Sequence, residues 1–346
     1  MAWKRTLLVV AASSCLTLAV VAGTLWAYPT AMKSSAIEVR SIDDLRPYAI
    51  PGAGEFLFRN YRIAKTYSDA DDRLVPPASW EPRPINNNLD DLLPDPWPAA
   101  YIEVYKQRFN PSSFFTNAVM LCNYAATHPE SRMSVKPFLD ALMDRLLMFS
   151  SAEGDALFVR YDFPFQAPAK RMLERGWVSG IGNGFALRGL MHIYNCTKDQ
   201  RALELADKYA NAFKIINTGT KQGPWFSYVD GFGFLWFDEY PYGEGSPSYV
   251  LNGQIYTIIG LLSYYRNRPE RWVLRMVQGG ITTVREYAHL YRRAGKVNRY
   301  ALSDWKKVDY APSRTPKQQL QLYQISGDPY FKAMAEAFER DMGKAD

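Results

Sequence analysis

Histidine and cysteine are scarce in this sequence, with three of each among 346 residues. The histidines, His128, His192 and His289, are scattered without the spacing of metal ligands, so we expect no metal site, and nothing in the sequence indicates a cofactor. Lys and Arg outnumber Asp and Glu by only 41 to 35, without any basic block or motif that would indicate nucleic-acid binding. This mild positive excess favours an anionic partner, such as an acidic glycan or a lipid surface.

The few cysteines say little about the redox environment of the protein. Cys15 lies in an apolar N-terminal segment, which leaves Cys122 and Cys196 as the one conceivable disulfide pair. Both positions belong to expected helices, where a buried free thiol is the more common state. We therefore expect two free thiols, and the low cysteine count neither requires nor excludes an oxidising compartment.

The N-terminus carries a long hydrophobic run, residues 7–27, preceded by Lys4 and Arg5 and closed by Trp26 and Tyr28. The run matches the roughly 20 residues that cross a bilayer. Its basic flank predicts a cytoplasmic N-terminus. We predict that residues 1–31 form a membrane anchor, with a cleaved signal peptide as the alternative. Either interpretation places the rest of the chain outside the cytoplasm, in the periplasm or the extracellular space.

The following segment, residues 32–98, is rich in Pro, Asp and Asn and shows little periodicity. Repeated prolines interrupt any helix there. We predict a stalk that ends by wrapping onto the folded domain, with Trp80 and Trp97 as the rings that pin it.

Residues 99–346 show helical periodicity in repeated pairs, interrupted by a short two-stranded excursion at 156–165. Ser134 is expected to cap the second helix, and Thr197 with Gln200 to form a capping box for the fourth. The pattern predicts a mainly α fold, an incomplete α/α toroid of about four helical hairpins with small β-hairpin insertions, preceded by an N-terminal transmembrane helix. Such a fold gathers its loops around one open end, where a polymer can lie.

Three loop-rich clusters, at residues 175–184, 236–253 and 298–310, are candidates for the site. Glycines in the first cluster allow either close helix packing or carboxylate binding at a helix N-terminus. The aromatic share of 14% is high. Most such rings are expected to belong to the core, but flat rings such as Trp177 and Trp236 can also stack on sugars.

Motifs in these clusters resemble the C-terminal domain of the D-glucuronyl C5-epimerases. They occur in the family's order between Gly176 and Phe338. They read Gly176-Trp-Val-Ser-Gly, Glu239-Tyr-Pro, Ser246-Pro-Ser-Tyr-Val-Leu-Asn-Gly, Ile259-Gly-Leu, and Asp309-Tyr with Gln319-Leu-Gln-Leu.

The resemblance implies inversion at C5 of glucuronate residues in a polymer, which gives iduronate. The C5 proton lies α to a carboxylate and is weakly acidic, so the reaction needs a base on one face, a proton donor on the other, and stabilisation of the enolate charge. By position, the resemblance implies catalytic roles for Glu239, Tyr240, Tyr300 and Tyr310.

A tyrosine with a pKa near 10 is a poor base at neutral pH unless a cation lies close to it. The family carries an arginine three residues after the tyrosine that matches Tyr300, and this sequence has Ser303 there. Either another Arg or Lys binds the substrate carboxylate, or the activity differs from that of the family. The candidates for the cation beside a tyrosine are Arg188, Arg299, Arg292 and Arg293. The candidates for substrate binding are Arg188, Arg299, Asn183, Trp177, Asn252 and Trp236.

Several alternatives stay open at this point. A polysaccharide lyase also begins by removing the C5 proton. A glycoside hydrolase would need two carboxylates, for which Asp230, Asp238, Glu239 and Glu244 are available. A non-catalytic glycan-binding protein tethered to the membrane is a third class, and the sequence leaves open whether the chain is a homodimer.

Overall fold

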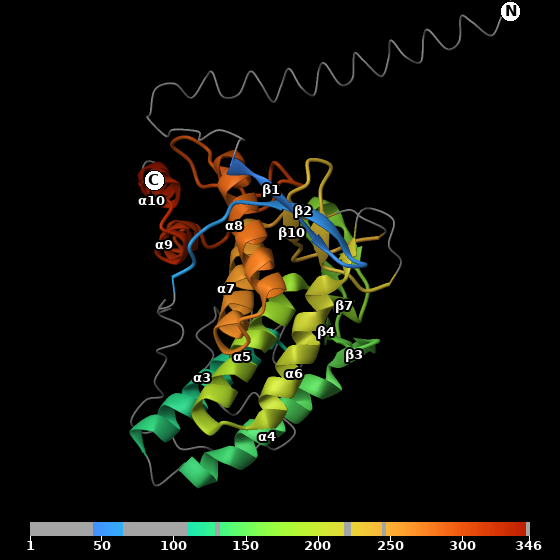
Figure 1. Cartoon of the computed structure of the whole chain (residues 1–346). Coiled ribbons are helices and arrows are strands. Elements are labelled where there is room, and N and C mark those ends of the chain that lie inside the picture. The colour runs from blue at the N-terminus through green and yellow to red at the C-terminus, as the bar shows by residue number, and fades with distance from the viewer. Residues whose placement is uncertain (1–43, 65–108, 129–131, 218–222, 244–246, 344–346) are drawn as a thin grey trace, which may run out of the picture. The chain divides into compact units, whose positions relative to one another are not determined.

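A computed structural model describes residues 44–64, 109–128, 132–217, 223–243 and 247–343, all of which belong to one compact unit spanning residues 42–346 (Figure 1). The predicted anchor at residues 1–31 lies outside the described residues, and so do Trp80 and Trp97. Among the helices that are described, none has both the length and the apolar character needed to cross a membrane.

Helices dominate the described part of the chain. The α-helices are α3 (Pro111–Thr127), α4 (Arg132–Met148), α5 (Gly180–Thr197), α6 (Gln200–Asn211), α7 (Leu251–Asn267), α8 (Arg271–Tyr291), α9 (Arg314–Ser326) and α10 (Pro329–Met342). Two short 3₁₀ turns, η5 (Pro168–Lys170) and η6 (Ala212–Lys214), complete the helical elements.

Consecutive helices pair into four hairpins, α3–α4, α5–α6, α7–α8 and α9–α10. The first helices of these hairpins lie side by side, with α5 packed between α3 and α7 and with α9 beside α7 (Figure 1). Their contact faces are apolar at helical spacing, as in α7, where Ile255, Ile258 and Leu262 are buried. This arrangement confirms the prediction of a mainly α fold with about four helical hairpins.

Glycines bring α5 and α7 unusually close together. A Cβ atom at Gly260 would lie 2.5 Å from the carbonyl oxygen of Gly184 and 2.6 Å from its Cα. A Cβ atom at Gly184 would in turn lie 3.0 Å from the Cα of Thr257. Of the two interpretations of the glycines in the 175–184 cluster, the structure therefore supports close helix packing at Gly184.

Gly260→Ala is expected to lower the free energy of unfolding by about 1–3 kcal/mol, because the added methyl group meets backbone atoms that move only if the helices separate. Chemical denaturation of the full chain measures this change. Gly231→Ala serves as the control, since a Cβ atom at Gly231 would meet no atom of the described residues within 4 Å. Equal stability of the two variants would contradict the close contact.

Two predicted helix caps differ from the structure. Helix α4 begins at Arg132, so Ser134 lies inside the helix and not at its cap. At the start of α6, the cap is Asp199, whose side chain accepts a hydrogen bond from the backbone N–H of Arg201 at 2.9 Å. The Thr197 hydroxyl instead donates to the Ile193 carbonyl at 2.7 Å, which leaves the predicted capping box unformed.

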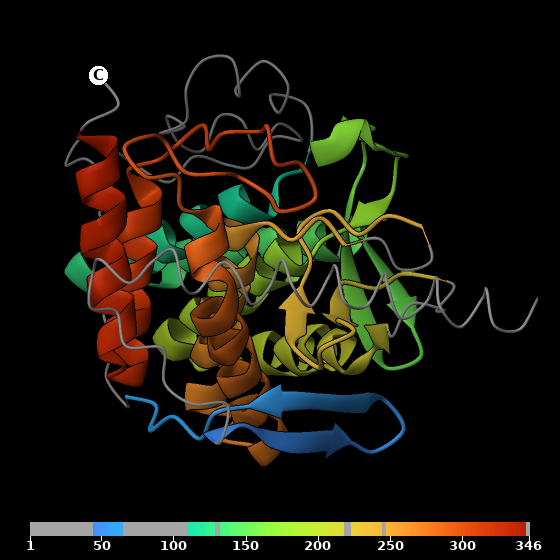
Figure 2. The same ribbon diagram turned by 90° about the horizontal axis from the view of Figure 1, so that it is seen from above.

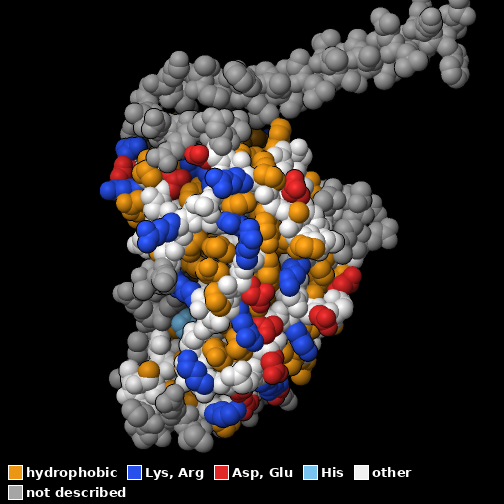
Figure 3. Space-filling view, viewed as in Figure 1, with side chains coloured by type: hydrophobic (Ala, Val, Ile, Leu, Met, Phe, Trp, Pro, Cys, Tyr) orange, Lys and Arg blue, Asp and Glu red, His pale blue; other side chains and the backbone are white. Residues whose placement is uncertain are grey.

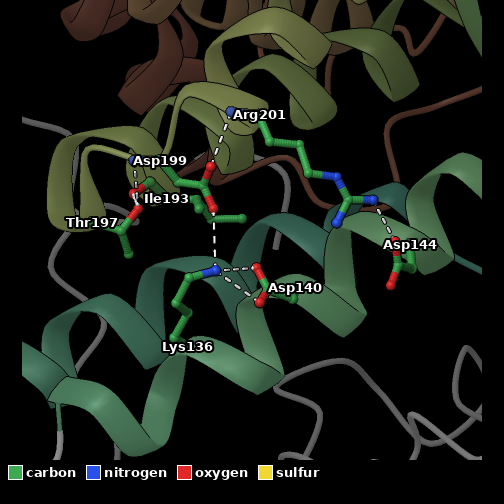
Figure 4. A network of polar contacts seen from close by, with 7 residues as sticks. All are labelled: Lys136, Asp140, Asp144, Ile193, Thr197, Asp199 and Arg201. Atoms are coloured by element: carbon green, nitrogen blue, oxygen red, sulfur yellow. Dashed lines mark hydrogen bonds and ion pairs between the residues drawn. The ribbon is translucent and has the colours of Figure 1, made fainter.

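A polar network on the surface joins α4 to the start of α6 (Figure 4). The ammonium group of Lys136 donates to Asp140 at 2.8 Å and to Asp199 at 3.4 Å, and Arg201 pairs with Asp144. These side chains are partly or largely exposed to solvent, so each pair contributes little to stability. The network holds the N-terminus of α6 against α4, and its role is structural.

Cys122 of α3 and Cys196 of α5 form a disulfide, with their Cα atoms 5.8 Å apart. The expectation of two free thiols is therefore wrong. The sequence placed both cysteines on helices, but only the packing of α3 against α5 brings them together.

Within the described residues, ten short strands form four small sheets. The strands are β1 (Arg46–Ile50), β2 (Gly54–Phe58), β3 (Ser150–Glu153), β4 (Ala156–Tyr161), β5 (Phe165–Gln166), β6 (Met172–Leu173), β7 (Trp177–Val178), β8 (Ile216–Asn217), β9 (Ser227–Val229) and β10 (Leu235–Phe237). The sheets are β1–β2, β3–β4–β7, β5–β6 and β8–β9–β10, and the β8–β9 pair is parallel whereas the other pairs are antiparallel. The predicted excursion at 156–165 corresponds to β4 and the start of β5.

The hairpin β1–β2 lies in a segment that the sequence predicted as a stalk. It packs along α8, as Figure 2 shows for the blue strands, and Phe56 is buried there. The following Arg59 forms an ion pair with Glu286 of α8 at 2.8 Å. Residues 44–64 are thus part of the helical unit. The sequence of this segment shows little periodicity and did not indicate this packing.

The face drawn in Figure 3 carries Lys and Arg side chains intermixed with Asp and Glu, with hydrophobic side chains exposed between them. This face therefore has no large continuous patch of one sign of charge.

Candidate active site

Three of the predicted catalytic side chains form one hydrogen-bonded chain. The phenol oxygens of Tyr240 and Tyr300 lie 3.0 Å apart, and the Tyr300 hydroxyl donates to Oε1 of Glu239 at 3.1 Å. All three residues are buried. Tyr300 comes from a segment that follows α8, so the fold joins two regions that lie some 60 residues apart in sequence.

Asp238 holds this chain of groups in place. Its carboxylate accepts hydrogen bonds from the backbone N–H and the hydroxyl of Ser248 and from the N–H of Tyr249. The Ser248 carbonyl in turn accepts a hydrogen bond from the Ser303 hydroxyl at 2.8 Å. Ser303, at the position where the resemblance implied an arginine, thus ties the segment of Tyr300 to the segment of Ser248.

Glu239 sits against the first turn of α7. A Cβ atom at Gly253 would lie 2.6 Å from Oε2 of Glu239, so only glycine leaves room for the carboxylate. Oε2 has no hydrogen-bond partner among the described residues. Burial raises the pKa of Glu239 to about 7, while hydrogen bonds from Tyr240 and Tyr300 and the charge of Arg314 oppose that rise. A carboxyl group with this pKa can both accept and release a proton at neutral pH.

The pKa values of the two buried phenols, Tyr240 and Tyr300, are shifted in the direction opposite to that expected for a tyrosine base. Burial, together with the negative charge of Glu239, raises the pKa of Tyr240 and of Tyr300 well above the usual value of 10. Both phenols are therefore protonated at neutral pH. Each accepts a proton only if it passes its own proton onward, and the hydrogen-bonded chain leads to Glu239.

Tyr310 lies on the exposed side of this chain, with half of its surface accessible. Its ring centroid is 5.4 Å from that of Tyr300. Nη1 of Arg314 donates to the Tyr310 hydroxyl at 3.2 Å, and the guanidinium carbon lies 4.9 Å from the centre of the Tyr310 ring. The structure therefore brings Tyr240, Tyr300 and Tyr310 together and places a cation beside the last of them.

Arg314 is a site residue that the sequence did not identify. It is held by Asp309, whose carboxylate accepts from Nη2 of Arg314 at 3.1 Å and from the Thr315 hydroxyl at 3.1 Å. Arg314 opens α9, and a cation at the positive N-terminal end of a helix is unfavourable without such a partner. Its position in the sequence, four residues after the candidate Tyr310, is the signal that could have identified it.

An aromatic wall borders Tyr240. Trp177 stacks on Tyr161 at 3.9 Å between ring centroids, and Phe165 stacks on Tyr240 at 5.2 Å. Trp177 also contacts the Tyr240 ring at 5.8 Å and donates its indole N–H to the Phe163 carbonyl. The structure thus places Trp177 next to a predicted catalytic residue, with Tyr161 and Phe165 as neighbours that the sequence did not select.

Three other predicted binding residues have structural partners instead. The Asn183 amide accepts from Val159 N–H and donates to the carbonyls of Leu157 and Tyr209, which uses its oxygen and its nitrogen. The Arg188 guanidinium is fully buried 4.0 Å from the Phe115 ring centroid.

Arg299 donates to the carbonyls of Leu290 and Arg292 at the end of α8. The alternative cations are also engaged, since Arg292 pairs with Asp341 and Arg293 donates to the Val297 carbonyl. A cation that contacts a phenol of the site is Arg314, which is not among the four arginines that the sequence suggested.

The remaining two candidates are buried. Trp236 is 2% exposed and donates its indole N–H to Asp230 at 2.9 Å, so its ring belongs to the core. Asn252 lies in the first turn of α7, next to Gly253, and its Oδ1 has no hydrogen-bond partner among the described residues. The N-cap of α7 is Val250, so Asn252 does not cap this helix.

Two of the carboxylates suggested for a hydrolase, Asp230 and Asp238, are held by structural partners. Asp230 accepts hydrogen bonds from the N–H groups of Phe232 and Phe234 and from the hydroxyl of Tyr287, and Asp238 is occupied by Ser248. Glu244 lies outside the described residues. In the part of the chain that the structure describes, no three His, Cys, Asp or Glu side chains are grouped to hold a metal ion.

The fold and the site define a class of protein: a mainly helical protein whose loops bring the phenols of Tyr240, Tyr300 and Tyr310 together with the carboxyl group of Glu239 and the guanidinium of Arg314. Comparison with known families identifies it further. Residues 153–340, more than half of the chain, match the family described as D-glucuronyl C5-epimerase C-terminus, and the chain belongs to this family. The matched range includes Glu239, Tyr240, Tyr300, Tyr310 and Arg314.

Two curated proteins are similar to this chain. A D-glucuronyl C5-epimerase of Caenorhabditis elegans is 34% identical over 96 residues, which are 28% of this chain and 14% of that protein. A protein of Methanocaldococcus jannaschii is 25% identical over 188 residues, 52% of this chain and 56% of that protein. The chain thus spans only part of the length of these curated relatives.

Solved structures with a similar arrangement include a D-mannose isomerase, with a TM-score of 0.46 at 10% identity over 68% of this chain and 59% of that chain. A cellobiose 2-epimerase from Bacillus thermoamylovorans has a TM-score of 0.44 at 11% identity and covers 67% of this chain and 58% of that chain.

Proposed function

We propose that this protein is a uronate C5-epimerase that converts D-glucuronate to L-iduronate residues in an acidic polysaccharide. The observation that carries the proposal is the chain Tyr240–Tyr300–Glu239 beside the pair Tyr310–Arg314. Membership of the epimerase family supports the reaction type. Two separate sets of acid–base groups are what inversion at a carbon centre requires.

One set removes the C5 proton. A phenol oxygen of Tyr240 or Tyr300 receives this proton while the hydroxyl proton of the chain moves to Glu239, which is ionised above its pKa of about 7. No free phenolate is needed in this step, which suits phenols whose pKa is raised by burial. The carboxylate of Glu239 is the final base.

The other set returns a proton to the opposite face. Tyr310 donates its hydroxyl proton to C5, and the Arg314 guanidinium, 3.2 Å from that oxygen, stabilises the negative charge that then develops on it. Arg314 also supplies the cation that attracts the substrate carboxylate. In the reverse direction, the two sets exchange roles.

The test is solvent exchange with the full chain. Glucuronan and other uronate polymers are incubated with the protein in deuterated water, and deuterium at C5 is measured by NMR. Deuterium at C5 together with iduronate in the product is the expected result. An unsaturated uronate that absorbs ultraviolet light would indicate a lyase instead. Tight binding of a polymer without any exchange would favour a glycan-binding protein.

We also propose that the domain works outside the cytoplasm, tethered by residues 1–31. The hydrophobic run at 7–27 with its basic flank supports a membrane anchor. The disulfide Cys122–Cys196 supports an oxidising compartment. Protease treatment of intact cells and of cells whose outer envelope alone has been permeabilised tests this: a domain that is digested only after the cytoplasmic membrane is lysed would contradict it.

A further inference from the structure

Exposed hydrophobic side chains gather on the loops around the site. Of the nine large hydrophobic side chains that are exposed among the described residues, five lie on three segments: the β5–β6 hairpin, the loop after Tyr240 and the segment 300–310. These five are Met172, Tyr242, Trp305, Val308 and Tyr310. Such a concentration on one set of loops is typical of a binding surface.

Trp305, the largest of these side chains, is 53% exposed and has a rigid support. The guanidinium carbon of Arg299 lies 4.5 Å from the centre of its ring. That guanidinium is itself fixed by two carbonyls at the end of α8, those of Leu290 and Arg292, each at 3.1 Å. The indole is therefore held in place by a charged group that has its own hydrogen-bond partners.

The turn that carries Trp305 is also fixed. The Asp304 carboxylate accepts hydrogen bonds from the N–H of Lys306 and from the N–H of Ala169 in the neighbouring hairpin, both at 3.2 Å. Ala169 and Lys170 have positive φ values of 59° and 57°, a conformation that non-glycine residues seldom adopt. Strained backbone of this kind persists where surrounding contacts hold it, often at functional sites.

The same segment joins Trp305 to the catalytic chain. The N–H of Tyr300 donates to the Lys307 carbonyl at 3.0 Å, and Nζ of Lys307 lies 6.0 Å from the centre of the Tyr300 ring. Lys306 and Lys307 are exposed next to Trp305. A flat ring with two adjacent cations suits a sugar that carries a carboxylate, because the ring contacts C–H groups while an ammonium pairs with the anion.

We propose that Trp305, supported by Arg299 and flanked by Lys306 and Lys307, is a subsite that binds an anionic sugar residue of the polymer next to the reacting one. This proposal rests on the proposed function for its substrate class. It assigns Arg299 a supporting role below the indole in place of direct contact with the reacting sugar.

The test compares Trp305→Ala with Phe232→Ala, which removes an equally exposed ring (61%) from the turn between β9 and β10. For Trp305→Ala we expect KM for a long glucuronan to rise ~10-fold with kcat unchanged, the scale of one lost aromatic contact. A short oligosaccharide that fills only the reacting position is expected to show no change. Trp305→Phe should restore most of the affinity, and Phe232→Ala should resemble the wild type.

Binding is measured separately by affinity electrophoresis in gels that contain glucuronan or hyaluronan, with neutral dextran as the control. Weaker retention of Trp305→Ala than of Phe232→Ala supports the subsite even if the wild type shows no turnover. That combination would contradict only the proposal of epimerase activity. Unchanged retention and unchanged KM in Trp305→Ala, with wild-type turnover present, would overturn the subsite alone. A wild-type protein that binds neither anionic polymer would overturn both proposals.

Discussion

Tyr240→Phe is expected to lower the rate of deuterium exchange at C5 at least ~10²-fold, the scale of losing an acid–base group, while the protein stays folded. The variant removes one hydroxyl that hydrogen-bonds to Tyr300 and leaves the ring between Phe165 and Trp177. The measurement is exchange by NMR under saturating polymer, with circular dichroism and thermal denaturation to verify the fold. Because the ring remains, KM should change far less than kcat.

Tyr300→Phe tests the same chain at its centre, because Tyr300 contacts both Tyr240 and Glu239. It is expected to have at least as large an effect on kcat as Tyr240→Phe. Tyr209→Phe is the matched control: Tyr209 is also buried, and its hydroxyl bonds to Ser150 at 2.7 Å, between α6 and β3. Wild-type turnover in Tyr240→Phe would remove Tyr240 from the mechanism.

Glu239→Gln is expected to lower kcat by ~10²–10⁴-fold, because the amide cannot accept the proton that the phenols pass on. In the wild type, activity should rise as the pH increases through about 7, the pKa to which burial raises the Glu239 carboxyl. The variant should lose this dependence in its residual activity. An unchanged pH profile in Glu239→Gln would assign the titration to another group.

Stability gives a second readout of Glu239 that does not involve turnover. Since the pKa of Glu239 is higher in the folded state, about 7 against an ordinary 4.5, the folded protein binds more protons between these values. This contribution to stability is fully present below pH 4.5, falls as the pH rises, and is lost above about 7. The loss is roughly 3 kcal/mol, from about 1.4 kcal/mol for each pKa unit.

Glu239→Gln should therefore unfold with a weaker pH dependence between pH 5 and 8 than the wild type. Asp238 contributes in the same direction, because burial raises its pKa to about 6, and this contribution stays in the variant. Denaturant titrations at several pH values measure the difference. Identical pH dependence in the two proteins would mean that Glu239 does not titrate in this range.

The residues that we propose as acid–base groups could be selected from the sequence through their motifs, but their partners could not. Tyr300 and Glu239 lie 61 positions apart, and their hydrogen bond cannot be predicted from the spacing of residues along the chain. Arg314 was missed for the same reason: its contacts with Tyr310 and Asp309 depend on where α9 begins. Burial also reversed an expectation, since the phenols gained higher pKa values and the carboxyl group became the group that titrates near neutrality.

The sequence by itself determined the helices, their pairing and the motif residues, because apolar periodicity and turn-forming residues act over a few positions of the chain. The tertiary structure decided which side chains meet. It placed Asn183 and Trp236 among internal partners, joined Cys122 to Cys196, folded residues 44–64 onto α8 and put Arg314 beside Tyr310. These outcomes depend on contacts between segments far apart in the chain, and such contacts leave no local pattern from which they can be predicted.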